Sequence, residues 1–172
     1  DGSTFQTYVM NPDGSKQTEL TDGAIGQATS PAWSPDGTRI AFSLLGEICV
    51  INSDGSNASN PVCLTNNSAA DDDPEWSPDG TKIVFMSWRD VTPGSISPNT
   101  EIYVMNADGS NQTNVTNDVS RDQNPSFRRD GSRIAFASDR HAQFNSDLYV
   151  MYADGSGPVQ LTNTLASTQA SW

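Results

Sequence analysis

Pro31-Ala-Trp-Ser-Pro-Asp-Gly-Thr-Arg-Ile-Ala-Phe42 is a phrase that this chain repeats, and the repetition decides its fold. The pattern returns at 74–85, and again at 125–136 with Arg128-Arg129 in place of Ser-Pro. The aromatic residue that opens each copy recurs at steps of 43, 51 and 45 residues, at Trp33, Trp76, Phe127 and Trp172. Repeats of this length that contain short strands are typical of β-propeller blades.

A second phrase follows the first in every unit. It consists of Tyr or Cys, then Val, a large apolar residue, two further residues and Asp-Gly, and it occupies 8–14, 49–55, 103–109 and 149–155. A Leu-Thr or Val-Thr pair comes after it, at 20–21, 64–65, 115–116 and 161–162. The β-branched and aromatic runs, bounded by Gly, Pro, Asp and Asn, predict four short strands in each unit. The Pro-Asp-Gly and Asp-Gly sequences predict the hairpin turns between them.

These phrases resemble the repeat of the TolB-type β-propeller family, a WD40-like family whose consensus is similar to Pro-x-Trp-Ser-Pro-Asp-Gly, Ile-Ala-Phe, Ile-Tyr-Val-Met, Asp-Gly and Leu-Thr. The match covers nearly the whole chain and departs at Arg128-Arg129 and at Cys49, where the other units have Tyr. The resemblance implies an all-β propeller of four-stranded blades. It also implies a binding or scaffolding module that acts through protein partners and is exported, to the periplasm or the cell exterior.

The repeat units divide a single propeller domain, 1–172, into three full blades and a split or incomplete fourth blade. We expect a half blade at about 1–21, full blades at about 22–65, 66–116 and 117–162, and the first strand of the split blade at 163–172. The Ile-Ala-Phe strand of the split blade is missing at both ends. Two interpretations follow. The chain is part of a longer propeller, or it presents open blade edges that a second copy covers, since unpaired strands are templates for association.

The charge and hydropathy of the chain exclude two classes of partner. Nine Lys and Arg residues against 21 Asp and Glu residues give a formal net charge of −12, which repels the phosphate backbone of a nucleic acid. The apolar residues form only short runs, far below the length of a membrane span. We therefore expect no nucleic-acid binding, no membrane insertion and no signal peptide in this stretch. Much of the acidity belongs to turns, where Asp is favoured for its backbone hydrogen bonds.

Cys49 and Cys63 are the only cysteines, and they occupy the third and fourth strands of one unit. They are 14 residues apart, whereas the matching residues of the other units are 11 apart, so the turn between them is longer while the strands keep their register. We expect a cross-strand disulfide, which would place the protein in an oxidising compartment. The alternative is two separate buried thiols.

Four Asn-x-Ser/Thr sequences are candidates for glycosylation, and most of them lie in or beside hairpin loops: Asn57, Asn66, Asn111 and Asn114. The alternative is that a chain rich in Asn, Ser and Thr contains such sequences by chance.

Catalytic and metal-binding groups are scarce in this sequence. His141 is the only histidine, in a predicted surface loop at 139–147, and no Gly-x-Ser-x-Gly elbow occurs. We therefore predict no catalytic residue, no cofactor and no enzyme activity. Calcium is the one cation with nameable ligands, because Asp71-Asp72-Asp73 and Asp122 precede inner strands and could converge on a central channel. The first unit has Ala28 at this place, so we assign no metal ligand.

The function is therefore expected to reside in surfaces. The insertion at 89–100 and the loop at 139–147 share one inter-strand position, so they build up one face, which is our candidate contact surface. The first hypothesis is a non-catalytic interaction or scaffolding module. The alternatives are a structural subunit of an extracellular filament assembled by self-association through open blade edges, and the propeller domain of a larger serine peptidase resembling the prolyl oligopeptidases.

Overall fold

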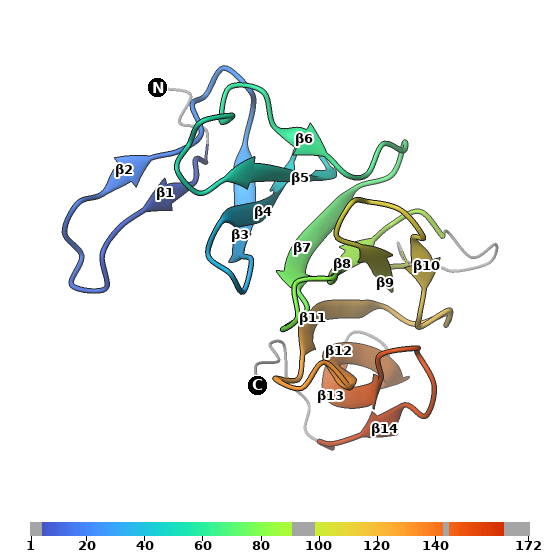
Figure 1. Cartoon of the computed structure of the whole chain (residues 1–172). Helices are drawn as coiled ribbons and strands as arrows, with labels where there is room; N and C mark the ends of the chain where they lie inside the picture. The colour runs from blue at the N-terminus through green and yellow to red at the C-terminus, as the bar shows by residue number, and fades with distance from the viewer. Residues whose placement is uncertain (1–4, 91–98, 143–144, 164–172) are drawn as a thin grey trace.

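The computed structural model describes residues 5–90, 99–142 and 145–163. Over these residues the chain forms strands β1 to β14 and no helix. The strands make one two-stranded sheet and three four-stranded antiparallel sheets (Figure 1). The predicted all-β fold with three full blades and an incomplete fourth is therefore confirmed. The expected strand within 163–172 falls almost entirely outside the described residues.

Each sheet is one blade, and its strands follow one another in chain order across the sheet. The half blade consists of β1 (Tyr8–Val9) and β2 (Thr18–Glu19). Blade 1 consists of β3 (Ala28–Trp33), β4 (Arg39–Leu44), β5 (Glu47–Asn52) and β6 (Val62–Cys63). Blade 2 consists of β7 (Asp71–Trp76), β8 (Lys82–Ser87), β9 (Glu101–Asn106) and β10 (Thr113–Asn114). Blade 3 consists of β11 (Asp122–Phe127), β12 (Arg133–Ala142), β13 (Asn145–Tyr152) and β14 (Val159–Gln160).

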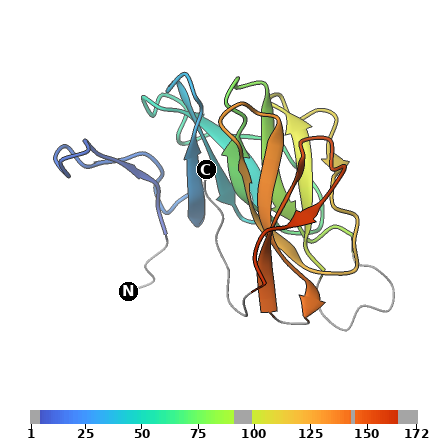
Figure 2. The same ribbon diagram turned by 90° about the horizontal axis from the view of Figure 1, so that it is seen from below.

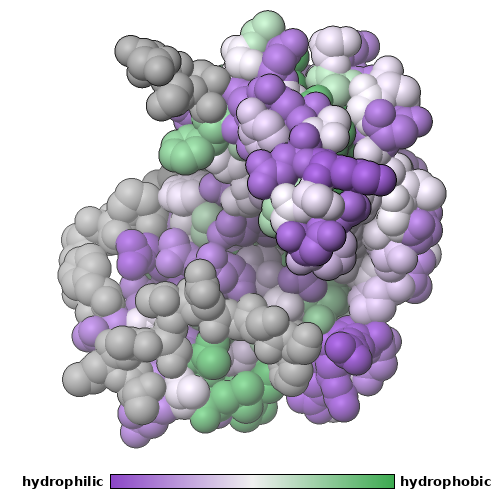
Figure 3. Space-filling view, turned by 90° about the vertical axis from the view of Figure 1, so that its left-hand side faces the viewer, coloured by the Kyte–Doolittle hydropathy of each residue, from purple (hydrophilic) through white to green (hydrophobic). Residues whose placement is uncertain are grey.

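The three full blades fan out from a common inner side, where β3, β7 and β11 lie (Figure 1). The half blade lies beside blade 1, at the other end of the fan from blade 3. No described strand lies between these two ends of the fan, and Figure 3 shows the molecule from this side.

The joint between neighbouring blades depends on the aromatic residue at the end of each inner strand. Trp76 packs into a core cluster with Ala41 and Val50 of blade 1, and the guanidinium of Arg39 lies 4.4 Å from its ring centroid. Burying a side chain of this size contributes on the order of 2–3 kcal/mol. Trp33 is the equivalent residue of blade 1, yet it is 52% exposed against 4% for Trp76. Its neighbour is the half blade, in which the described residues form only β1 and β2 and no equivalent of β4, the strand whose Ala41 packs on Trp76.

In each Pro-Asp-Gly turn, the aspartate carboxylate accepts the hydrogen bonds that hold the turn. Asp79 Oδ1 accepts hydrogen bonds from the Ser77 hydroxyl at 2.6 Å and from the Thr81 backbone amide at 3.0 Å. Gly80, with φ +70°, then closes the turn in a conformation that glycine adopts without strain. The same carboxylate role recurs at Asp36 and Asp130. These aspartates therefore build the hairpins of the fold.

A β-bulge in each inner strand ties the three blades together, and the sequence did not reveal it. Ser30, Asp73 and Asn124 all have left-handed φ angles, of 51°, 52° and 50°, where the register of each inner strand shifts. The Ser30 hydroxyl donates to Asp73 Oδ1 at 2.9 Å, and the Asn124 amide donates to Asp73 Oδ2 at 2.9 Å. One carboxylate in blade 2 thus bonds to both neighbouring blades.

One hairpin corrects a prediction. The sequence predicts a loop over 139–147, yet β12 continues to Ala142 and β13 begins at Asn145, with these two residues paired. The extension is polar, so it lacks the alternation of apolar residues that marks a strand. His141 Nδ1 lies 2.6 Å from the Tyr149 hydroxyl of β13, a contact that links the two strands.

Candidate interaction surfaces

The strands run between two opposite faces of the fan, which are the upper and lower edges in Figure 2. The turn face carries the Pro-Asp-Gly and Asp-Gly turns. The loop face carries the connections between second and third strands and the links from one blade to the next. The insertions at 89–100 and 139–147 belong to the loop face, although 91–98 and 143–144 lie outside the described residues.

The turn face presents aspartates whose negative charge persists to low pH. In each turn the carboxylate accepts a hydrogen bond from the backbone amide two residues further on, at Asp13, Asp36, Asp54, Asp79, Asp108, Asp130 and Asp154. These hydrogen bonds favour the ionised form and lower the pKa of every member, that of Asp36 to about 2. The acidity predicted to come from turns is located here.

Shallow grooves separate neighbouring blades at the turn face. A groove of about 440 Å³ between blades 1 and 2 is lined by Arg39, Val62, Leu64 and Asp108 among others. A similar groove of about 380 Å³ lies between blades 2 and 3.

The loop face exposes isolated large apolar side chains. Leu45, in the tight turn between β4 and β5, is 77% exposed, and Val119, between β10 and β11, is 71% exposed. The loop face therefore offers apolar contact points on a rigid support, as binding surfaces on loops commonly do.

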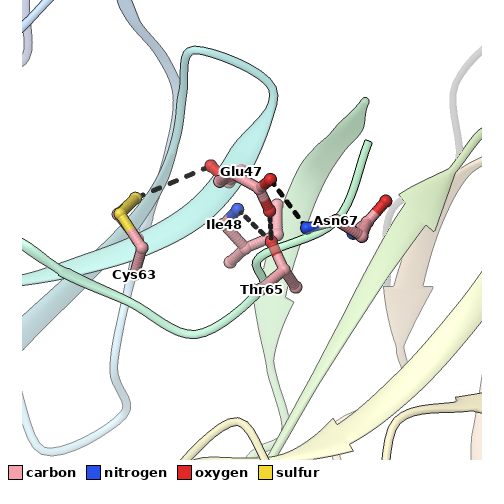
Figure 4. Close-up of a disulfide and its surroundings, with 6 residues drawn as sticks. Glu47, Ile48, Cys63, Thr65 and Asn67 are labelled. Carbon is pink, nitrogen blue, oxygen red and sulfur yellow. Dashed lines mark hydrogen bonds between the residues drawn. A yellow bond between two sulfur atoms is a disulfide. The ribbon is translucent and has the colours of Figure 1, made fainter. Parts of the chain in front are cut away.

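The threonine of each Leu-Thr pair has a structural role beneath the loop face. The Thr65 hydroxyl accepts a hydrogen bond from the Ile48 amide at 2.9 Å and donates to Glu47 Oε2, and Glu47 Oε1 accepts from the Asn67 amide at 3.0 Å (Figure 4). The same arrangement joins Thr21 to Gln6, Thr116 to Glu101 and Thr162 to Asp147. Burial raises the pKa of Glu101 to about 7, although its hydrogen bonds oppose the shift.

A buried ion pair lies under the loop face in blades 2 and 3. Arg89 Nη2 lies 2.7 Å from the fully buried Asp71 Oδ2, and its guanidinium stacks 4.5 Å from the Tyr103 ring centroid. In blade 3, Arg140 pairs with Asp122 at 3.0 Å. Burial raises the pKa of Asp122 to about 6 against the opposing effect of Arg140.

The aspartates named as possible calcium ligands have partners within the blades. Asp71 and Asp122 each pair with the arginine of their own blade. Asp72 accepts a hydrogen bond from Ser43, and Asp73 bonds to the two neighbouring bulges. Over residues 5–90, 99–142 and 145–163 there is no cluster of three or more acidic, His or Cys side chains that could hold a metal ion.

Cys49 and Cys63 are registered partners on β5 and β6, and their sulfurs are bonded at 2.01 Å. Cys49 is fully buried in the core between the half blade and blade 1, whereas Cys63 lies at the exposed outer strand. The disulfide thus fastens the outer edge of blade 1 to its core.

The four glycosylation candidates differ in their surroundings. Asn66 and Asn111 are exposed. Asn57 Oδ1 accepts a hydrogen bond from the Asn52 amide at 2.7 Å, and Asn114 donates to Asp90 Oδ2 at 2.7 Å. Asn57 and Asn114 are half-buried, so Asn66 and Asn111 are the better-placed predictions.

His141 is exposed at the end of β12, and its recorded hydrogen-bond partner is the Tyr149 hydroxyl. This contact joins two strands and resembles no nucleophile–base pair, in which a serine or cysteine bonds to the imidazole.

No helix capable of crossing a membrane occurs in the portion of the chain that the structure describes.

Comparison with known proteins gives a fold and no closer relationship. No family model and no curated protein matches the chain. Among solved structures, a putative TolB from Agrobacterium tumefaciens matches with a TM-score of 0.74 and 22% identity over 90% of this chain. A chain from a nidogen/laminin complex matches with a TM-score of 0.72 and 14% identity over 92% of this chain. A puromycin hydrolase mutant matches with a TM-score of 0.67 and 19% identity over 92% of this chain.

The chain spans only 55%, 57% and 27% of the lengths of these three proteins. The likenesses show that the chain has a TolB-like β-propeller fold. Interaction propellers and propellers joined to hydrolases both share this fold, so the function must be argued from the surfaces.

Proposed function

We propose that the chain is a non-catalytic β-propeller that binds protein partners through its loop face, outside the cytoplasm. The main support for this proposal is that the repeated polar side chains make the hydrogen bonds and ion pairs that hold the fold together. The turn aspartates hold hairpins, the threonines hold third strands, and the buried aspartates pair with arginines. None of these groups is left in the arrangement that nucleophilic or acid–base catalysis requires.

The loop face is the proposed contact surface because rigid strands present apolar side chains there. Leu45 and Val119 are more exposed than any other large apolar residue that the structure describes. Such side chains contribute to binding when a partner removes them from water. The likeness to a chain of the nidogen/laminin complex supports an interaction role for this fold.

The disulfide supports a periplasmic or extracellular location. Disulfides persist in oxidising compartments and are rare in the reducing cytosol. The Cys49–Cys63 bond therefore fits an exported protein, as the sequence resemblance also implies.

Site-specific photo-crosslinking tests the proposal. A photoreactive residue placed at Leu45 or Val119 is expected to form defined adducts with partner proteins of the exported fraction, and excess unmodified chain should abolish them. Val62, which is 59% exposed at an outer strand, is the matched control position. If no competable adduct forms at either loop-face position, or if Val62 gives the same adducts, the loop face is not the binding surface.

The second candidate function is the propeller domain of a larger hydrolase, which the likeness to puromycin hydrolase favours. In this case the natural full-length protein would react with a fluorophosphonate probe and cleave short peptides. The absence of labelling in the full-length protein would exclude a serine hydrolase.

A further inference from the structure

The groove between blades 1 and 2 at the turn face lies between two complete blades, β3–β6 and β7–β10 (Figure 1). We call this space, of about 440 Å³, the blade 1–2 groove. Val50, Val62 and Leu64 line it from blade 1, and Ala107 lines it from blade 2, so most of its surface is apolar. The two sides are in close contact, since a Cβ at Gly109 would stand 2.8 Å from the Leu64 carbonyl oxygen.

Arg39 places an unpaired cation in this groove. It is half-buried, and its guanidinium lies 4.4 Å from the ring centroid of Trp76. Within the described part of the chain, Arg39 takes part in no ion pair and its guanidinium donates no hydrogen bond. Four other arginines pair with aspartates: Arg89, Arg121, Arg128 and Arg140. The donors of the Arg39 guanidinium are therefore available to a ligand, and their planar geometry matches a carboxylate.

The other two complete blades use the equivalent cation internally. In blade 2, Lys82 is registered opposite Asn106, and its Nζ donates to Asn106 Oδ1 at 3.3 Å. In blade 3, Arg133 is registered opposite Tyr152, and its guanidinium lies 4.5 Å from that ring centroid. In blade 1, Arg39 has no such partner on its own sheet and stacks on a ring of the next blade instead.

The lengthened turn of blade 1 adds a second donor to the groove. In blade 2 the Asn106 amide donates to the Ser110 carbonyl oxygen at 2.9 Å, and blade 3 has the same backbone bond. In blade 1 the Asn52 amide donates instead to the side-chain Oδ1 of Asn57, at 2.7 Å. This bond fixes the Asn57 side chain at the groove, while its Nδ2 donates to no residue that the structure describes.

The outer strand of blade 1 also differs from that of blade 2. Val62 is 59% exposed and occupies the register position that Thr113 has in blade 2. Cys63 follows it and is bonded to Cys49 of β5, so β6 is attached covalently to the blade core. The lengthened turn, the apolar Val62 and the disulfide thus all lie in the hairpin that borders the groove.

Asp108 supplies a negative charge on the blade 2 side of the groove. It is exposed, and hydrogen bonds from the hydroxyl and the amide of Ser110 lower the pKa of its carboxyl, so it is ionised at neutral pH. Its Oδ1 accepts both of these bonds, and its Oδ2 bonds to no described residue. The groove therefore carries one available cation and one available anion beside an apolar lining.

We propose that the blade 1–2 groove binds a free α-amino acid with an apolar side chain, such as leucine. Its carboxylate accepts hydrogen bonds from Arg39 and Asn57, and its ammonium group pairs with Asp108. Its side chain lies against Val50 and Val62. The site is on the turn face, so it goes beyond the proposed loop-face function.

The charges of the groove favour a zwitterion over an ion of either sign. A ligand with a single charge is attracted by one of Arg39 and Asp108 and repelled by the other, whereas a zwitterion pairs with both. A zwitterion has no net charge, so the net charge of −12 on the chain does not oppose its binding. The volume and the apolar lining with a few polar groups are typical of small-molecule sites, which span about 300–1,000 Å³.

An NMR titration of the ¹⁵N-labelled chain with L-leucine and two derivatives tests the proposal. N-acetyl-leucine keeps the carboxylate and lacks the ammonium charge, and leucine amide keeps the ammonium charge and lacks the carboxylate. L-leucine is expected to give saturable shifts at the backbone amides of Val62, Leu64 and Asp108. Its Kd should be at least about tenfold below the Kd of either derivative, because each derivative loses one charge-assisted contact.

Two variants test the two charges separately. Arg39→Met keeps an apolar stem against Trp76 and should weaken L-leucine about tenfold, while leucine amide binds no worse than before. Asp108→Asn keeps the Oδ1 acceptor of the turn and should weaken L-leucine about tenfold, while N-acetyl-leucine binds no worse than before. The retained derivative in each case shows that the groove is folded. Arg129→Met, which removes an exposed arginine from the groove between blades 2 and 3, is the matched control and should change none of the three Kd values.

Several outcomes would overturn the proposal. One is the absence of shifts at the groove amides with L-leucine. Another is equal binding of N-acetyl-leucine or of leucine amide, because the ligand would then be a simple carboxylate or amine, such as one end of a polypeptide. A loss of binding in Arg129→Met would place the ligand in the other groove. The loop-face crosslinks report on the opposite face, so either proposal can fail while the other stands.

Discussion

Asp71→Ala should be the most damaging single change in the inner strands. The Asp71 side chain is fully buried and that of Arg89 is 20% exposed, so the substitution leaves a nearly buried cation without its carboxylate. Removing one partner of a buried pair costs about 3–5 kcal/mol, and the partial exposure of Arg89 places the expected loss near 3 kcal/mol. The Tyr103 ring, 4.5 Å from the guanidinium, remains as a weaker partner.

The double variant Asp71→Ala/Arg89→Met removes both charges and should recover about 1–2 kcal/mol of that loss, since a paired removal leaves no isolated charge. Blade 1 is the natural precedent, because Ala28 and Leu44 are the registered partners where blade 2 has Asp71 and Ser87. Urea unfolding of the single variants and the double variant gives the coupling energy. Glu19→Ala, at an exposed strand residue, is the control and should change the free energy of unfolding by under about 0.5 kcal/mol. A double variant less stable than Asp71→Ala would refute the reasoning.

Three further predictions concern pH, backbone approach and redox state. The pKa of Glu101 rises from 4.5 to about 7 on folding, so between these pH values the native state holds a proton that the unfolded chain releases. The free energy of unfolding should therefore fall as the pH rises through this window. Urea titrations at several pH values should show this slope, and Glu101→Gln should flatten it. Gly109→Ala should lower the free energy of unfolding by at least about 1 kcal/mol more than Gly14→Ala, as measured by thermal unfolding. Both glycines have left-handed φ angles, but only at Gly109 would the new Cβ stand 2.8 Å from a backbone oxygen. Equal losses of stability would contradict the close approach. Reduction of Cys49–Cys63, which closes a 14-residue separation, should lower stability by about 3 kcal/mol in calorimetry with and without reductant, and an unchanged melting temperature would refute it.

The blades and their turns could be predicted because the residues that build them repeat. Pro-Asp-Gly and Leu-Thr recur wherever the same carboxylate or hydroxyl serves the same backbone groups. The bulge could not be found this way, since Ser30, Asp73 and Asn124 share a conformation and no side-chain type. What they have in common is a polar side chain that bonds to a neighbouring blade.

The buried ion pairs carried a signal that the sequence analysis did not use. Asp71 and Arg89 are separated by 18 residues, as are Asp122 and Arg140, and blade 1 lacks both partners. A local motif does not show these pairs, because each arginine lies 18 residues beyond its aspartate, at or after the end of the second strand.

At Gly109 and Gly155, the glycine of the Asp-Gly turn meets the backbone of the preceding blade rather than a selected side chain. A new blade inserted by gene duplication would therefore meet a complementary surface on each neighbour. If a blade is lost, the surfaces of its two neighbours still complement each other. Such a protein changes length in whole units at little cost to its remaining contacts, so the number of blades is free to vary between descendants while the form of each blade is preserved.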